Sequence, residues 1–293
     1  MRVIGCSKGT HIAKDIARSL KLPYTSVETR FFPDGEIYVR IPIQIDEEDV
    51  VVVQSMAKRP NDLLMEFIFV LETLKDMGVK RIIGIIPYFP YARQDERFKP
   101  GEAISLNIVT HLLERLGLEL VITVDMHLHR KELESLFKET EIINVSAMED
   151  LAEYFLENYP SSDALVIAPD SEATQWAKVF ASKLRLKYLV FYKERKGDEN
   201  VSLKCHLDNN YVERAIVVDD IVSTGTTLEA TANVLLEHGI SELYAVFTHG
   251  ILVPPAEHKL SKFKELISTD TVVNPYSRVR VGGLLAKTLV KYL

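Results

Sequence analysis

The stretch from Ala215 to Leu228 combines residue types that could hold a sugar phosphate. Two adjacent carboxylates, Asp219 and Asp220, are followed at once by a run of hydroxyl side chains around Gly225. Backbone amides and hydroxyls in such a loop can bind a phosphate, especially where a helix begins. The two carboxylates would repel a bare phosphate, but they could accept hydrogen bonds from ribose hydroxyls or hold Mg²⁺ while the loop binds the phosphate.

The elements that position this loop can be predicted from the apolar pattern. A continuous β-branched run that begins at Ala215 predicts a buried parallel strand, which ends on the two aspartates. The pattern from Leu228 to Glu237 predicts a helix. A solvent-exposed strand end followed by a helix cap is the simpler interpretation, and it would be favoured for two adjacent aspartates alone.

Two other predicted strand ends carry polar residues of the same kind. The strand predicted at 119–124 is followed by Asp125 and His127, and the strand predicted at 164–168 is followed by Asp170. Open α/β sheets bind ligands at the carboxyl ends of their strands. Most histidines have structural or surface roles, so His127 alone is weak support for a binding site.

Three further segments interrupt the regular pattern. Residues 31–39 contain a Pro-Asp-Gly turn between two strand-like pieces, which predicts a β-hairpin. Residues 87–101 mix aromatic, charged and proline residues without a period, as is typical of an ordered functional loop. Residues 193–200 form a charged run with a glycine, which is typical of a solvent-exposed hairpin tip. Taken singly, each segment has an ordinary structural explanation.

Strands and helices alternate along the whole chain, which predicts an α/β fold with parallel, doubly wound sheets. A repeated order of helix end, glycine and strand, at 77–83 and again at 238–244, indicates two similar halves. We expect one domain at 1–143, joined by the C-terminal helix 283–293, and a second domain at 144–282. The other predicted helices are 10–20, 61–77, 104–116, 147–158, 174–184 and about 255–263, and the other predicted strands are 2–6, 50–54, 81–86, 142–145, 188–192, 243–248 and 265–268.

The composition sets limits on the class of protein. At 293 residues with 47% hydrophobic residues, the chain is long enough for two α/β domains with substantial cores. The formal net charge of −7 argues against a general nucleic-acid or acidic-membrane surface. Two cysteines far apart in sequence indicate neither a disulfide framework nor a zinc site. No apolar run approaches transmembrane length and the N-terminus lacks a signal-peptide pattern, so we expect a cytoplasmic enzyme.

Together these segments resemble the ribose-phosphate diphosphokinase (PRPP synthetase) family, which has the type I phosphoribosyltransferase-like fold. The resemblance extends over nearly the whole chain. The matching segments, in order, are 61–66, 89–95, 124–127, 193–196, 215–228 and 248–250. The resemblance implies two similar domains, each a doubly wound, mostly parallel sheet flanked by helices.

The resemblance also implies an activity. In this family the anomeric hydroxyl of ribose 5-phosphate attacks the β-phosphorus of MgATP, which gives 5-phospho-α-D-ribose 1-diphosphate (PRPP) and AMP for nucleotide biosynthesis. Such a transfer depends on positioning and charge neutralisation more than on covalent chemistry. The expected partners are therefore ATP and ribose 5-phosphate, with Mg²⁺ as cofactor and with neither nucleic acid nor a membrane.

The residues that match the family's ATP site form two walls and one further contact. They are Phe32, Asp34 and Glu36 on the hairpin, Arg93, Gln94 and Asp95 in the 87–101 loop, and His127. The two walls usually come from different subunits, which implies a homodimer or larger homo-oligomer with the ATP site at a subunit interface. His127 and Asp170 match the ligands of Mg²⁺ in the Mg²⁺-ATP complex.

The remaining matches concern the sugar and the transition state. Asp219 and Asp220 match the residues that meet the ribose hydroxyls and a second metal ion. The residues that match the cradle for the 5-phosphate are Ser223, Thr224, Gly225, Thr226 and Thr227. Lys193 and Arg195 match a catalytic pair that is expected to close over the β-phosphate and stabilise the transition state.

The sequence also departs from the family pattern. Ser223 stands where many members have Asp, and Thr226 stands where many have Gly. The sequence stops at Leu293, short of the tail that helps to form a regulatory ADP and phosphate site in the regulated members. We therefore expect ADP to compete with ATP and not to act at a separate site.

Two other functions share parts of this pattern. A phosphoribosyltransferase has the same loop and fold, but it needs neither the adenine walls of residues 1–143 nor a second similar domain. A catalytically silent regulatory subunit would lack catalytic positions, whereas His127, Lys193 and Arg195 are all present. A P-loop kinase is excluded because the sequence contains no G-x-x-x-x-G-K-[S/T] string.

Overall fold

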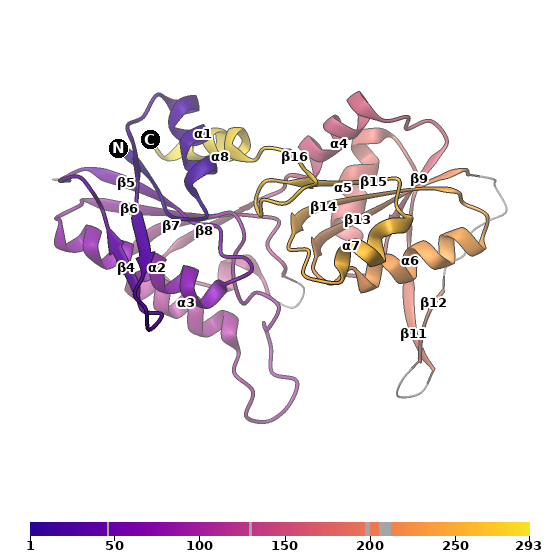
Figure 1. Cartoon of the computed structure of the whole chain (residues 1–293), viewed down its shortest axis with the longest axis horizontal. Helices are drawn as coiled ribbons and strands as arrows, with labels where there is room; N and C mark the ends of the chain where they lie inside the picture. Colours follow the sequence, from indigo (N-terminus) through magenta and orange to yellow (C-terminus); the bar gives the residue numbers. More distant parts are fainter. Residues whose placement is uncertain (46, 129–130, 197–199, 205–211) are drawn as a thin grey trace. The chain divides into compact units, whose positions relative to one another are not determined.

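The computed structural model describes residues 1–45, 47–128, 131–196, 200–204 and 212–293, and for 193–196 and 200–204 it describes the backbone alone. Contacts within the chain divide it into two compact units (Figure 1). The first unit comprises Met1–Val145 and Arg280–Leu293, and the second comprises Ser146–Val279. Each unit is built around its own six-stranded sheet.

The first unit has a parallel sheet with the strand order β2-β1-β5-β6-β7-β8. Its strands are β1 (Arg2–Gly5), β2 (Tyr24–Ser26), β5 (Asp49–Val53), β6 (Arg81–Ile86), β7 (Leu118–Val124) and β8 (Glu141–Val145). Its α-helices are α1 (Thr10–Leu20), α2 (Pro60–Asp76), α3 (Ser105–Arg115) and α8 (Gly282–Leu289). In Figure 1, α1 and α8 cover one face of the sheet, and α2 and α3 cover the other. Covered on both faces, the central strands are continuous apolar runs.

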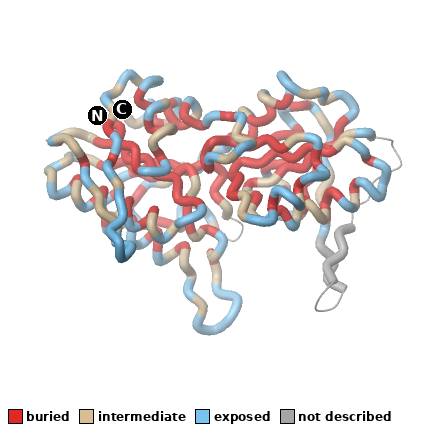
Figure 2. Tube along the Cα trace, in the orientation of Figure 1, coloured by how far each residue is buried: buried red, intermediate tan, exposed pale blue. Residues whose placement is uncertain are grey.

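The second unit repeats this plan with the strand order β10-β9-β13-β14-β15-β16, again all parallel. Its strands are β9 (Ala164–Ala168), β10 (Tyr188–Val190), β13 (Arg214–Val222), β14 (Glu242–Gly250), β15 (Glu265–Thr269) and β16 (Ser277–Val279). Its α-helices are α4 (Met148–Asn158), α5 (Thr174–Leu184), α6 (Thr226–Glu237) and α7 (Ala256–Lys259). Ile216 packs with residues of α4 and α5, whereas Val217 packs with residues of α6 and α7. Figure 2 shows the buried residues concentrated along the strands of both sheets.

Two antiparallel hairpins stand apart from the sheets. In the first unit, β3 (Glu28–Phe31) pairs with β4 (Ile37–Arg40). In the second unit, β11 (Tyr192–Lys196) pairs with β12 (Asn200–Lys204). The first hairpin confirms the prediction for residues 31–39.

The structure confirms the predicted α/β class with parallel sheets, and it differs from the predicted elements in detail. The strand predicted at 188–192 ends at Val190, and the next residue, Phe191, is fully buried and donates its backbone N–H to the Ala168 carbonyl at 2.9 Å. The charged run that follows begins with a strand of its own, β11. The edge strands β2 and β16 were not predicted, because three residues are too few to show a period. No helix among the described residues has the length and apolar character needed to span a membrane.

A close backbone approach fixes the turn from β1 into α1. Gly9 is buried and immediately precedes α1. A Cβ atom on Gly9 would lie 2.0 Å from the carbonyl oxygen and 2.4 Å from the carbonyl carbon of Val53 in β5. Because both of these atoms belong to the backbone, a larger residue at position 9 cannot be accommodated by rotating a side chain.

We predict that Gly9→Ala lowers the free energy of unfolding by roughly 1–3 kcal/mol, as expected for overpacking. The measurement is the urea concentration at the midpoint of unfolding. Gly283→Ala is the matched control, because a Cβ atom at Gly283 in α8 meets nothing within 4 Å. The control should raise the stability by about 0.5–1 kcal/mol, because alanine favours a helix over glycine. Equal midpoints for Gly9→Ala and the wild type would contradict this account.

Candidate functional site

The aspartate pair lies near the carboxyl end of strand β13, which continues to Val222. Ile221 and Val222 pair with His249 and Gly250 of β14, so the ladder continues past the aspartates, where the sequence predicted the strand to end. The Asp219 carboxylate accepts a hydrogen bond from the Asp220 backbone at 3.0 Å, and the Asp220 carboxylate accepts one from the Ile221 backbone at 2.8 Å. These local bonds hold both side chains at the carboxyl end of the strand.

The loop from Ser223 to Thr227 leads directly into α6. Gly225 takes a φ of +76°, a left-handed conformation that favours glycine, and caps the helix. The hydroxyl oxygens of Thr224 and Thr226 lie 3.1 Å apart. The backbone amides of the first turn of α6 have no partners within the helix, and the helix dipole makes this end favourable for an anion. The structure thus brings together the hydroxyls and amides that the sequence predicted for a phosphate cradle.

A third carboxylate reaches the same edge of the sheet. Asp170 follows β9, which pairs in parallel with β13 through Ile167 and Val217. The Asp170 carboxylate accepts hydrogen bonds from the backbone of Glu172 at 3.1 Å and of Ala173 at 3.2 Å.

The three carboxylates disfavour one another's charge. Burial raises the pKa of the Asp219 carboxyl well above its usual value, and the negative charges of Asp220 and Asp170 raise it further. Carboxylate oxygens are ligands that Mg²⁺ prefers, and proteins usually hold Mg²⁺ with one or two carboxylates together with substrate phosphates and water. The donor set therefore fits Mg²⁺, and a bound cation would relieve the repulsion at Asp219. Among the residues that the structure describes, no group of three or more His, Cys, Asp or Glu side chains is arranged to hold a metal ion.

In the first unit, the turn of the β3–β4 hairpin carries Phe32, Asp34 and Glu36. The Phe32 backbone N–H donates to the Glu36 carbonyl at 2.8 Å, and the Glu36 backbone donates to the Asp34 carboxylate at 3.2 Å. All three side chains are exposed, with 39% of Phe32 accessible to solvent. The turn therefore keeps the three predicted residues together.

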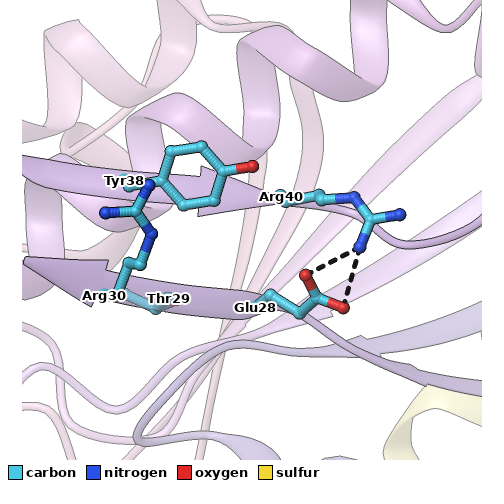
Figure 3. Close-up of a pocket in the computed structure, with 5 residues that line it drawn as sticks. All are labelled: Glu28, Thr29, Arg30, Tyr38 and Arg40. Atoms are coloured by element: carbon cyan, nitrogen blue, oxygen red, sulfur yellow. Dashed lines mark hydrogen bonds and ion pairs between the residues drawn. The ribbon is translucent and has the colours of Figure 1, made fainter.

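The hairpin presents an aromatic and basic face that the sequence analysis did not identify. The guanidinium carbon of Arg30 lies 4.5 Å from the centre of the Phe32 ring and 4.3 Å from that of Tyr38. Figure 3 shows this guanidinium beside the Tyr38 ring and, farther along the hairpin, two hydrogen bonds from Arg40 to Glu28, at 3.0 and 2.8 Å. A pocket of about 400 Å³ is lined by Glu28, Thr29, Arg30, Tyr38 and Arg40. The two-residue period of each strand is the signal that places these charged and aromatic residues together.

The opposite face of the hairpin is held to α2 by a buried carboxylate. Glu66 in α2 is fully buried and accepts a hydrogen bond from the Thr29 hydroxyl at 2.8 Å. Glu66 also accepts bonds from the Ser7 backbone at 2.8 Å, the Ser7 hydroxyl at 2.5 Å and the Gln54 amide at 2.8 Å. These bonds connect the hairpin to the segments that follow β1 and β5. Glu66 lies in the 61–66 motif, but its role depends on contacts that the sequence does not show.

The other predicted residues of the first unit lie in two separate segments. In the loop between β6 and α3, Arg93 is exposed, Asp95 is 2% exposed, and the Gln94 amide donates to the Glu96 carbonyl at 3.0 Å. His127 is half-buried after β7 and follows Asp125, which has a φ of +37°. His127 belongs to the first unit, whereas Asp170 belongs to the second.

The structure describes only the backbone at the two positions that the sequence predicted to be a catalytic pair. The backbone places Lys193 and Arg195 in β11, paired with Leu203 and Val201 of β12. Their side chains lie outside the described part of the chain. The two positions are therefore in a strand of a hairpin, and not in a loop after a strand.

Comparisons with known proteins cover nearly the whole chain. A family model for the N-terminal domain of ribose phosphate pyrophosphokinase matches residues 1–117, and a phosphoribosyl transferase domain model matches residues 139–277. The ribose-phosphate pyrophosphokinase of Methanothermobacter thermautotrophicus is 36% identical over 98% of this chain and 99% of that protein. The protein of the same name from Methanopyrus kandleri is 35% identical over 99% of this chain and 98% of its own length. The crystal structure of phosphoribosylpyrophosphate synthetase from Mycobacterium smegmatis superposes with a TM-score of 0.87 at 28% identity, covering 99% of this chain and 98% of that one.

The raised pKa of Asp219 predicts the effect of its charge on stability. Between its ordinary pKa and its raised pKa in the folded state, the unfolded chain binds fewer protons than the folded chain, so stability falls as the pH rises. Asp219→Asn replaces the carboxyl with a neutral amide and therefore removes this loss of stability at high pH. We expect the variant to be more stable than the wild type at pH 8 without metal, by about 1.4 kcal/mol for each pKa unit of the shift. The advantage should shrink toward pH 4.

Unfolding midpoints in urea at pH 4 and pH 8 measure this effect. Glu157→Gln, which changes an exposed carboxylate in α4, is the control and should show no such pH dependence. If Asp219→Asn is less stable than the wild type at pH 8, repulsion among the three carboxylates is not the dominant effect.

Proposed function

This chain belongs to the ribose-phosphate pyrophosphokinase family, and from that premise we propose how its own residues carry the family's reaction. It is a transferase that moves the β,γ-diphosphoryl group of ATP to the anomeric hydroxyl of ribose 5-phosphate, which gives PRPP and AMP for nucleotide biosynthesis. The observation that carries our assignment of residues is the placement of two carboxylates and a phosphate cradle at the end of one buried strand.

The sugar phosphate binds along the end of β13. Asp219 and Asp220 accept hydrogen bonds from ribose hydroxyls, because ionised carboxylates are acceptors and hydroxyls are donors. The 5-phosphate is bound by the segment from Ser223 to Thr227, where hydroxyls and the first amides of α6 supply donors. Support for this comes from the left-handed Gly225 and from the 3.1 Å approach of the two threonine hydroxyls.

ATP binds through the first unit. The adenine ring stacks on Phe32, and the carboxylates of Asp34 and Glu36 accept hydrogen bonds from its edge. Arg93, Gln94 and Asp95 form the other wall. The exposure of the Phe32 ring supports this assignment, because a stacking surface has to be accessible to the base.

The two walls of the ATP site come from different subunits of a homodimer or larger homo-oligomer. Several large apolar side chains on the first unit are exposed, and these are Phe31 beside the hairpin turn, Met65 and Phe69 on α2, and Ile108 and Leu112 on α3. Within each helix the two residues are four positions apart and therefore share one face. Such apolar faces favour burial against a second copy of the chain, which in a two-fold dimer presents the same surface.

We assign Mg²⁺ to His127 and Asp170 together with the phosphates of ATP. Bound there, Mg²⁺ would offset the negative charge of the triphosphate and of the nearby carboxylates. Asp170 supplies the oxygen ligand that Mg²⁺ prefers, whereas contact with the His127 imidazole can be made through a bound water. The raised pKa of Asp219 supports a need for positive charge at this edge of the sheet.

Lys193 and Arg195 are assigned to the transition state. Both supply hydrogen-bond donors and positive charge, which stabilise the diphosphoryl group as charge redistributes during transfer. Their positions in β11 are two residues apart, and residues at this spacing lie on the same side of a strand.

The first test measures AMP formation from ATP with and without ribose 5-phosphate. We expect AMP to form only when the sugar phosphate and a divalent cation are both present, and an excess of EDTA to abolish it. The physical reason is that an ATP triphosphate beside the carboxylates of Asp170, Asp219 and Asp220 would otherwise meet like charge. Full turnover in a chelator would rule out the metal assignment, and AMP formation independent of the sugar would rule out the transfer.

The second test concerns Lys193 and Arg195. If the pair interacts with the β-phosphate in the transition state, Lys193→Ala and Arg195→Ala should each lower kcat by about 10²–10³-fold, with much smaller changes in KM for ribose 5-phosphate. Lys178→Ala removes an exposed lysine from α5 and should retain the wild-type kcat. A large rise in KM for the sugar at unchanged kcat would instead make the residue a ground-state anchor.

A further inference from the structure

A lysine outside the predicted site reaches the phosphate cradle. Lys259 is the last residue of α7, which lies beside α6 in Figure 1. Its ammonium group donates a hydrogen bond to the Thr226 hydroxyl oxygen at 2.6 Å. The same nitrogen lies 3.9 Å from the Glu229 carboxylate on the next turn of α6, and 24% of the Lys259 side chain is exposed.

The contact with Lys259 determines which way the Thr226 hydroxyl donates. An ammonium group has three donors and no acceptor, so Thr226 must be the acceptor in this bond. The hydroxyl proton of Thr226 is therefore available for a different acceptor. The Thr224 hydroxyl lies 3.1 Å from that of Thr226, and both residues are exposed. A chain of donors thus runs from Lys259 through Thr226 toward the place where an anion would bind.

The position of α7 is fixed by the backbone around the cradle. The backbone N–H groups of Ile251 and Leu252 donate to the Val222 carbonyl at 2.9 and 3.2 Å, and Val253 donates to the Ser223 carbonyl at 3.1 Å. Leu260, next to Lys259, packs against Gly225, where a Cβ atom would lie 3.2 Å from the Leu260 Cγ atom. Because these contacts hold the segments on both sides of α7 against the cradle, Lys259 is held at a defined position relative to Thr226.

We propose that Lys259 is a positioning residue for the 5-phosphate of ribose 5-phosphate, acting through the Thr226 hydroxyl. Lys259 occupies one acceptor position of Thr226, so that this hydroxyl donates its proton to a phosphate oxygen when the sugar binds. Only the Thr226 hydroxyl would separate the positive charge of Lys259 from the bound phosphate. This charge matters because the loop directly follows two carboxylates, Asp219 and Asp220. This inference rests on the proposed function of the 219–227 loop. Because Thr226 stands where many family members have Gly, this action through the Thr226 hydroxyl depends on a residue that departs from the usual pattern.

A neighbouring lysine provides a matched control. Lys262 lies three residues farther along, is exposed, and donates to the Asn233 side chain on α6. Lys259→Met and Lys262→Met therefore remove the same charge and the same kind of hydrogen bond to the same helix. Only Lys259 is bonded to a residue of the cradle, so the two variants separate a local role from a general effect of charge.

The experiment measures kcat and KM for both substrates in Lys259→Met, Lys259→Arg and Lys262→Met. We expect Lys259→Met to raise KM for ribose 5-phosphate roughly 10- to 100-fold, the range typical of a hydrogen bond to a charged group. Its KM for ATP and its kcat should remain close to the wild-type values. Lys259→Arg keeps a cationic donor and should recover most of the loss, while Lys262→Met should behave as the wild type. Equal KM values for the two methionine variants, or no recovery with arginine, would overturn the proposal.

A double-mutant cycle tests the route through Thr226. If Lys259 acts through this hydroxyl, adding Lys259→Met to a Thr226→Val variant should raise KM for the sugar far less than it does in the wild type. Additive effects would show that Lys259 does not act through Thr226. Should Lys259→Met lower the melting temperature by itself, Lys259→Gln is measured in the same cycle, and additivity in that variant would overturn the proposal equally.

Calorimetric titration of ribose 5-phosphate without ATP separates this inference from the proposed function. If the wild type neither binds the sugar phosphate nor forms AMP with it, the assignment of the loop is wrong, and the proposal for Lys259 is wrong with it. If the wild type binds and Lys259→Met binds equally well, the proposal for Lys259 alone is wrong. Weaker binding by Lys259→Met than by Lys262→Met supports it.

Discussion

Parallel pairing of β13 with β9 on one side and β14 on the other is the constraint on which the site depends. Parallel strands end at the same edge of a sheet, so the pairing brings Asp170 to the same edge as the carboxylates near the end of β13. The same pairing fixes the start of α6, whose first amides face that edge. The arrangement has an electrostatic cost, since the neighbouring carboxylates and burial raise the pKa of Asp219. An edge that is unfavourable for its own charges is suited to a cation and to hydroxyl donors.

The hairpin in the first unit combines a fixed base with an exposed turn. At its base, the buried Glu66 carboxylate accepts four hydrogen bonds, which offset the cost of removing a charged group from water. At its turn, Phe32 stays exposed and is flanked by the Arg30 guanidinium and the Tyr38 ring. Because the strands of the hairpin are anchored to α2, the exposed aromatic ring keeps a defined orientation. Stacking on a flat nucleobase requires such an orientation.

The first unit also distinguishes between two classes of enzyme that have a loop like 219–227. A phosphoribosyltransferase has that loop, so the second unit alone would not distinguish the two. Residues 1–117 match the N-terminal domain of ribose phosphate pyrophosphokinase, and relatives of that name align over nearly the whole chain. The sequence motifs in 61–66 and 89–95 already favoured the diphosphokinase. A phosphoribosyltransferase, which consumes PRPP, needs neither the adenine walls of residues 1–143 nor a second similar domain.

The sequence by itself determined most of the strands and helices, the carboxylates at strand ends and the family, because hydrophobic period, turn residues and short motifs are local properties of the chain. Only the tertiary structure decided that Lys259 contacts Thr226, which is 33 residues away, and that Glu66 supports the hairpin through Thr29. It also decided that Arg30 and Tyr38 meet beside Phe32, and that the charged run after Phe191 is a strand. Such contacts depend on the register between segments and on which side chains converge in space, and neither is encoded in the residues next to one another along the chain.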